Sequence, residues 1–251
     1  FDEPTQDYFL NFVTKTLTHH EQQILETRVT INEIFRAIKD MNTNKSPGID
    51  GIPIEFYLKY WDIIKIELYE IFLYIIDGLV PSENQRTAVL TLIPKEGDLN
   101  LLKTWRPVSL ICCDIKIIAK ILAKRIGPLL YSLLSENQHC ILGKSIIDCN
   151  TKMRDIMFYT SKNNMTGAII NVDWEKAFDR VNWNFLFKIF KKMKFPDFVI
   201  TWIKTLYTDV QSLVLINGHC SKKLMSIEGS GKDVLCLCFS LLFSKTHCTW
   251  L

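Results

Sequence analysis

The chain lacks any long hydrophobic run. Its longest apolar stretches, such as Leu235–Phe243, fall well short of the roughly 18 residues that a helix needs to cross a bilayer. It also lacks internal repeats and low-complexity tracts. These absences exclude a membrane-spanning segment and a repeat array, so we expect no membrane partner.

A zinc-binding pattern is missing as well, although the chain has eight cysteines. Cys236, Cys238, His247 and Cys248 carry atoms able to bind a metal, but they lack a second well-spaced pair. No local pattern supports a Cys–His nucleophile. Cysteines without a signal peptide indicate a reduced, intracellular chain, located in the nucleus or the cytoplasm.

The chain carries little net charge. The formal value of +3 permits a nucleic-acid partner but does not indicate one, because a basic face matters more than the sum. With 48% hydrophobic and 23% charged residues, the 251-residue chain can bury a sizeable core as one large domain or two small ones. It begins at Phe1 rather than at a methionine and ends within an apolar stretch, so we expect it to be part of a longer protein.

Hydrophobic periodicity predicts a helix-rich α+β fold. Residues 1–26 are polar with scattered aromatics and are interpreted as a linker remnant. Helical spacing predicts helices over residues 31–41, 54–76, 114–134, 146–159, 182–193 and 197–208, the first behind a Thr30–Glu33 capping box. Strands are predicted over residues 87–94 and 106–110, and a hairpin over residues 212–216 and 221–227, turned at Asn217-Gly218 in the type I′ manner.

The most informative stretch is Asn171–Arg180. It follows Gly167–Ile170, a short apolar run typical of a buried strand. An acidic residue at the end of such a strand, before a polar turn into a helix, is suited to hold a metal ion against a phosphate. Taken alone, Asp173 fits a helix N-cap better than a metal ligand.

Five further motifs change that balance. They are Asn44–Gly51, Leu92–Lys95, Trp105–Leu110, Asp114–Arg125 and Gly143–Asp148. With Asp173–Asp179, they resemble the reverse transcriptase of non-LTR retrotransposons, the LINE type, in order and spacing over roughly residues 27–230. The resemblance implies a right-hand architecture, with a fingers-like region over residues 27–160, a partial palm over residues 161–251, and no thumb.

The resemblance also implies a reaction and its partners. It is the template-directed addition of deoxynucleoside triphosphates to a DNA primer, copying an RNA template, with Mg²⁺. Such nucleotidyl transfer uses two divalent ions held by carboxylates on neighbouring strands. By its place in the family's motif Asp173 is the catalytic metal ligand, with the Trp174 carbonyl beside the second ion. Phe178 matches the ring that lies beneath the incoming sugar, although an ordinary core Phe is the alternative.

Four basic residues also match positions of the family. Lys95 and Arg106 lie on its fingers hairpin, where a Lys point charge and an Arg fork suit triphosphate oxygens. Lys45 and Lys144 lie in loops that face the template, where they would pair with phosphates without reading bases. In isolation each of these residues fits a solvated surface charge.

The chain departs from the family pattern near its C-terminus. Residues 229–243 lack the Arg-Gln pair and both prolines of the corresponding stretch, and residues 138–143 are also eroded. The family's paired aspartates lie beyond this point, yet Asp233 is the single acidic residue after Glu228. We therefore expect the second metal-binding carboxylate and the C-terminal part of the polymerase to be missing, and this chain to be inactive.

Three interpretations remain open from the sequence. The first is a reverse-transcriptase fragment, the second a non-catalytic nucleic-acid-binding module, and the third an expressed relic without function. For the first, we expect the Asp173 strand to lie antiparallel beside the Asn217-Gly218 hairpin, packed on the helices over residues 146–159 and 182–193. We also expect Asp173, Phe178, Lys95 and Arg106 to converge on one open cleft.

Overall fold

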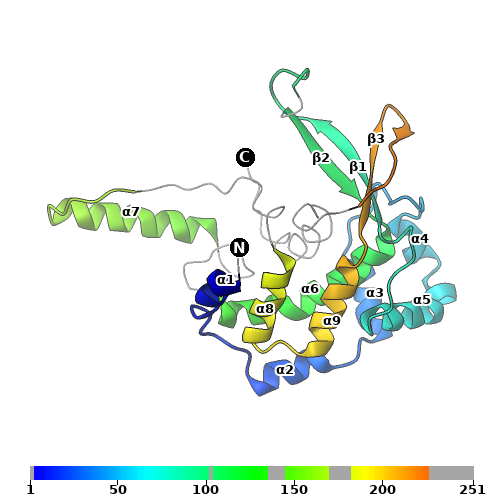
Figure 1. The fold of residues 1–251 in the computed structure, drawn as a ribbon, viewed down its shortest axis with the longest axis horizontal. Helices are drawn as coiled ribbons and strands as arrows, with labels where there is room; N and C mark the ends of the chain where they lie inside the picture. The colour runs from blue at the N-terminus through cyan, green and yellow to red at the C-terminus, as the bar shows by residue number, and fades with distance from the viewer. Residues whose placement is uncertain (1–2, 102–103, 135–144, 170–181, 226–251) are drawn as a thin grey trace.

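The computed structural model describes residues 3–101, 104–134, 145–169 and 182–225. Its elements are helices α1 (Glu3–Leu10), α2 (His19–Glu26), α3 (Ile31–Lys39), α4 (Ile54–Lys59) and α5 (Trp61–Ile76), strands β1 (Thr87–Pro94) and β2 (Trp105–Leu110), helices α6 (Cys113–Leu133), α7 (Ile146–Lys162), α8 (Trp183–Lys192) and α9 (Asp197–Tyr207), and strands β3 (Gln211–Ile216), β4 (His219–Cys220) and β5 (Leu224–Met225). Figure 1 shows a body of helices from which a small sheet projects. This α+β arrangement confirms the predicted fold class.

Helix α6 runs through the centre of the core. Its apolar residues are buried over most of its length, with Ile117 and Ile118 fully inaccessible. Helices α2 and α3 pack against α6, while α5 and α9 pack against each other. The removal of these side chains from water is the main stabilising term for the body of the protein.

The sheet has the strand order β2-β1-β3-β4, with β5 also paired to β3. Strands β1 and β2 are antiparallel, with Ile93 opposite Arg106, and β1 and β3 are parallel, with Thr87 opposite Gln211. The turn after β3 has positive φ at Asn217 and Gly218, as a type I′ turn requires. The sheet therefore joins strands from the expected fingers-like region, residues 27–160, and from the expected partial palm, residues 161–251.

Local sequence signals predict most elements well. Strand β1 covers the predicted residues 87–94, and the Thr30–Glu33 capping box starts α3 as expected. The predicted helix over residues 54–76 is two helices, because the chain turns at Tyr60. That turn places Trp61 in the core, stacked on Phe35 with 4.9 Å between ring centroids. A tertiary contact thus ends a helix that neither Pro nor Gly interrupts.

The expected linker over residues 1–26 contains helical structure. Residues 3–26 include α1 and α2, and α2 begins with a Thr18–Glu21 capping box. Leu17 and Leu25 are buried in the core. This polar segment therefore includes two short helices, of which α1 buries Gln6 and α2 buries Leu25.

Within the described residues, strand β1 is the neighbour of the Asn217-Gly218 hairpin. Strand β1 occupies one edge of β3, while β4 and β5 occupy the other. Residues 165–169 form no strand, and Ile170 to Asp173 lie outside the described residues. Ala88 and Val89 of β1 are buried, whereas Ile169 is exposed. The expected pairing of the Asp173 strand with the hairpin stays a prediction.

The two helices expected beside that sheet lie elsewhere. Helix α7 begins at the Ser145–Asp148 capping box and extends away from the body (Figure 1), while α8 packs against α1 and α9. Among the described residues, none of the helices combines the length and apolar character that a bilayer-spanning segment needs.

Candidate functional site

The β1–β2 hairpin carries two of the predicted site residues near its tip. Arg106 pairs with Ile93, and the Lys95 N–H donates to the Thr104 carbonyl at 2.7 Å, which continues the ladder by one step. Because side chains alternate along strands, Lys95 and Arg106 lie on the same face, one diagonal step apart. The hairpin therefore brings together two cations that are separated in the sequence.

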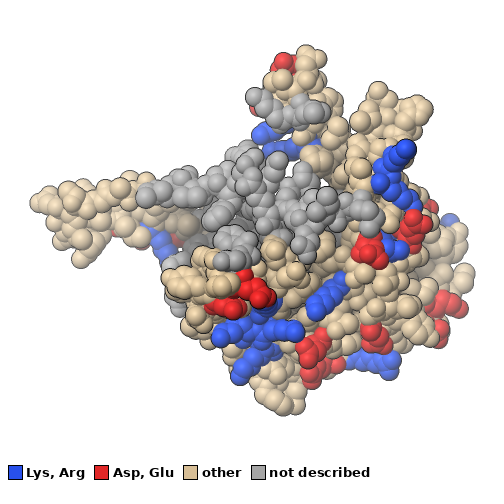
Figure 2. Space-filling model, viewed as in Figure 1, with Lys and Arg blue, Asp and Glu red and all other residues tan. Residues whose placement is uncertain are grey.

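Both cations are exposed and available. Neither Lys95 nor Arg106 forms an ion pair with a carboxylate in the part of the chain that the structure describes. Figure 2 shows basic side chains on the projecting hairpin, with acidic ones at its tip. Two adjacent unpaired cations on one face form a site for an anion with several oxygens, and Arg106 is suited to contact two of them at once.

The loop that carries Lys45 meets the base of this hairpin. Lys45 is exposed, and three residues later Gly48 packs on the backbone of Ile111 and Cys112, just after β2. A Cβ at Gly48 would lie 2.6 Å from the Ile111 carbonyl carbon, so only glycine fits this approach. The loop is thus fixed against the strand end, with Lys45 beside it.

A polar cluster joins this loop to the residues before β1 and the residues after β2. Side-chain atoms of Asp50, Cys112 and Asp114 lie within 4.8 Å of one another. The Asp114 carboxylate accepts from the Gln85 side chain at 2.5 Å and from the Ile115 N–H at 2.7 Å, and the Cys112 thiol donates to the Asn84 carbonyl at 3.3 Å. These bonds connect the residues before β1 to the residues after β2, so they hold the two legs of the hairpin at its base.

Burial dominates the electrostatics of this cluster. It raises the pKa of Asp114, an effect that the nearby Asp50 carboxylate increases and the Gln85 hydrogen bond opposes. Burial and the Asp50 charge raise the pKa of the Cys112 thiol to about 12, and burial with Asp114 and Asp50 raises the pKa of Tyr57. At neutral pH the thiol and the phenol are therefore protonated.

This cluster does not fit Mg²⁺. Magnesium requires about six oxygen ligands in near-octahedral geometry. Here one of the three groups is a protonated thiol, and both oxygens of Asp114 already accept hydrogen bonds from the protein. We interpret the cluster as a structural clamp for the hairpin rather than as a metal centre.

Helix α6, which follows the hairpin in the chain, is fixed by a buried arginine. The Arg125 guanidinium forms two 2.9 Å hydrogen bonds to the Glu33 carboxylate and donates to the carbonyls of Leu25, Thr27 and Arg28. Burial raises the pKa of Glu33, but the hydrogen bonds from Arg125 and Thr30 outweigh it and the pKa is lowered overall. This fork ties α6 to the segment that connects α2 with α3.

The other predicted site residues, Asp173, Trp174, Phe178 and Lys144, lie outside the described residues. Their convergence with Lys95 and Arg106 stays a prediction. Sequence reasoning missed the cluster of Asp50, Cys112 and Asp114. Each of the two aspartates nevertheless lies in one of the quoted motifs, Asn44–Gly51 and Asp114–Arg125. The usable signal was Gly48, whose position before Asp50 suggested a close backbone approach.

Comparison with known families gives the class of protein. The family described as reverse transcriptase (RNA-dependent DNA polymerase) matches residues 93–229, more than half of the chain. The chain belongs to this family. The match contains Lys95, Arg106, Lys144, Asp173, Trp174 and Phe178, and Lys45 precedes it.

Two relatives specify the type further. The "Transposon TX1 uncharacterized 149 kDa protein" of Xenopus laevis is 34% identical over 83% of this chain and 16% of its own length. The "Retrovirus-related Pol polyprotein from type-1 retrotransposable element R2" of Popillia japonica is 22% identical over 78% of this chain and 27% of its own length. The chain is a reverse-transcriptase segment of the LINE type, and it spans less than a third of either relative.

Proposed function

We propose that this chain supplies the nucleotide-gripping part of an RNA-directed DNA polymerase. The hairpin of β1 and β2 corresponds to the fingers, and Lys95 and Arg106 bind the triphosphate of an incoming deoxynucleotide. The observation that supports this role is the pair of exposed cations on one face of a hairpin whose base is clamped. A fixed base limits the positions that the two charges can take, which favours a defined anion over diffuse attraction.

The remaining roles follow from the family. Asp173 would hold Mg²⁺, with the Trp174 carbonyl beside it and Phe178 beneath the sugar. The ion would neutralise charge on the triphosphate. Lys45 and Lys144 would contact phosphates of the RNA template and DNA primer. Gly48 fixes the loop that carries Lys45 against the hairpin base. This position supports a contact between Lys45 and a nucleic-acid phosphate near the nucleotide.

The test is a titration of the protein with dATP in the presence of magnesium, measured by calorimetry. Lys95→Gln with Arg106→Gln should weaken binding by at least about tenfold, since a hydrogen bond to a charged group contributes about 1.5–3 kcal/mol. The matched control is Arg36→Gln with Lys59→Gln, which removes the same charge from exposed residues on α3 and α4. Equal affinity in both double variants would remove the triphosphate role from the hairpin.

A non-catalytic nucleic-acid-binding module is the second candidate. Its support is that Lys95 and Arg106 are exposed and form no ion pair within the described residues, since such cations can bind phosphates of a nucleic acid without reading bases. Two-ion chemistry needs several carboxylate oxygens, so we expect the 251-residue polypeptide by itself to show no primer extension with magnesium or manganese. Incorporation of labelled deoxynucleotide on an RNA template, absent in an Asp173→Ala control, would contradict this candidate.

A further inference from the structure

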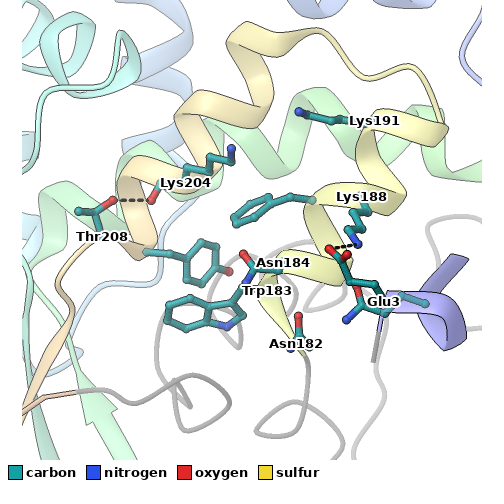
Figure 3. A pocket seen from close by; sticks show the side chains of 11 residues that line it. Glu3, Asn182, Trp183, Asn184, Lys188, Lys191, Lys204 and Thr208 are labelled. Atoms are coloured by element: carbon teal, nitrogen blue, oxygen red, sulfur yellow. Dashed lines mark hydrogen bonds and ion pairs between the residues drawn. The ribbon is translucent and has the colours of Figure 1, made fainter. Parts of the chain in front are cut away.

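A separate cavity lies among α1, α8 and α9, on the helical body rather than on the projecting sheet. Its volume is about 750 Å³, within the range of ligand-binding pockets. Figure 3 shows Lys204 of α9 and Thr208, which follows that helix, on one side, Lys188 and Glu3 on the other, and Trp183 between them. None of these residues belongs to the polymerase roles proposed above.

Positive charge dominates the wall of this cavity. Three lysines line it, Lys188, Lys191 and Lys204, against a single carboxylate, Glu3. Glu3 lies 3.6 Å from Lys188, but its side chain is 86% exposed, so the pair is weak. Figure 2 shows Lys and Arg side chains gathered over α8. The N-terminal end of α8, which also lines the cavity, adds the positive end of the helix dipole.

Aromatic surface lies beside these lysines. The rings of Trp183 and Tyr207 are 4.9 Å apart between centroids, and Phe187 carries Lys204 over its face at 5.2 Å. The Trp183 indole N–H is buried and finds no hydrogen-bond acceptor among the residues described. A buried donor without an acceptor costs about 1–3 kcal/mol.

We propose that this cavity binds single-stranded nucleic acid outside the polymerase cleft. The three lysines contact consecutive phosphates, and a base stacks on the aromatic surface. Lysines around aromatic rings are the combination by which proteins bind single strands without reading their sequence. An acidic peptide would use the lysines but leave the rings without a stacking partner.

The binding test uses a fluorescein-labelled single-stranded RNA of about 12 nucleotides, close to known site sizes. Lys188→Gln, Lys191→Gln and Lys204→Gln together should weaken binding, measured by anisotropy, by at least about tenfold. The salt slope should fall by about two, because each released phosphate contact contributes about 0.7 on a single strand. The matched control replaces Lys39, Lys59 and Lys65 by Gln, which removes the same charge from α3, α4 and α5. Equal losses in both triple variants would overturn the proposal.

Three further arms locate the ligand and separate this proposal from the nucleotide role. Glu3→Gln should strengthen RNA binding, and photo-crosslinking of 4-thiouridine RNA should label the peptide that contains Trp183. The double variant of Lys95 and Arg106 should lose dATP binding but retain RNA binding, so either proposal can fail alone. Crosslinking confined to other peptides, or competition by polyglutamate as effective as by RNA, would contradict a nucleic-acid site in this cavity.

Discussion

The base and the tip of the β1–β2 hairpin differ in almost every physical respect. At the base, Asp114 is half-buried and hydrogen-bonded, and Gly48 touches backbone directly. At the tip, Lys95 and Arg106 are exposed and without ion pairs in the described structure. The two ends therefore have different roles. Polar contacts at the base fix the hairpin, and exposed charges at the tip are accessible to a ligand. We expect substitutions at the base to change stability and those at the tip to change binding.

The largest effect is expected at Arg125, which fixes the helix that follows the hairpin. Arg125→Met leaves Glu33 and the carbonyls of Leu25, Thr27 and Arg28 without their donor. The pair is only partly buried, since the Arg125 side chain is 8% and the Glu33 side chain 32% exposed. The loss of five hydrogen bonds should still lower the free energy of unfolding by about 3 kcal/mol. Urea denaturation followed by circular dichroism measures it. Arg36→Met on exposed α3 is the control, and a similar loss there would contradict the special role of Arg125.

The next effect is expected at Gly48. Gly48→Ala places a methyl group against the backbone of Ile111 and Cys112, which cannot move as a side chain can. Such overpacking should cost about 2 kcal/mol in unfolding free energy. The contrasting variant is Gly127→Ala in α6, where a Cβ meets nothing within 4 Å, and it should stabilise by up to about 1 kcal/mol. Thermal unfolding of both variants measures these changes in stability. A Gly48→Ala variant as stable as the parent would contradict the interpretation that the base of the hairpin is clamped.

A smaller effect concerns the pH dependence of Asp114. Burial raises the pKa of its carboxyl, so the folded state binds this proton more tightly than the unfolded state. The stabilisation is complete below the unfolded pKa of about 4 and is lost as pH rises through the folded pKa. Asp114→Asn should therefore gain stability relative to the parent as pH rises from about 4 to neutral.

Unfolding free energies of the two proteins at several pH values test this expectation. Glu33, whose lowered pKa acts in the opposite direction, is present in both proteins and cancels from the difference. A constant difference between parent and Asp114→Asn would mean that Asp114 is not destabilised when charged.

The smallest change in stability is expected at the tip. Lys95→Gln with Arg106→Gln should alter the unfolding free energy by less than about 0.5 kcal/mol, because both side chains are exposed. The same variant should nevertheless lose most of its dATP affinity. A double variant that unfolds more easily would place these residues in the structural part of the hairpin, and the comparison between base and tip would fail.

Local signals in the sequence determined the helices, the strands and the family. The Thr30–Glu33 capping box, the apolar alternation of residues 87–94 and the Asn217-Gly218 turn each act over a few residues, so one sequence suffices to find them. The motifs at Leu92–Lys95 and Trp105–Leu110 likewise indicated which residues would meet on one hairpin, and the register confirms that Lys95 and Arg106 share a face.

Which strands, helices and side chains lie side by side was decided by the tertiary structure alone. The parallel pairing of β1 with β3 joins residues 87–91 to residues 211–215, and the Arg125 fork joins α6 to the segment before α3. The base cluster brings Asp50, Gln85 and Asp114 together from three segments. Such contacts depend on which surfaces compete for the same buried position, and that competition is settled by packing of the whole chain rather than by any pattern within a segment.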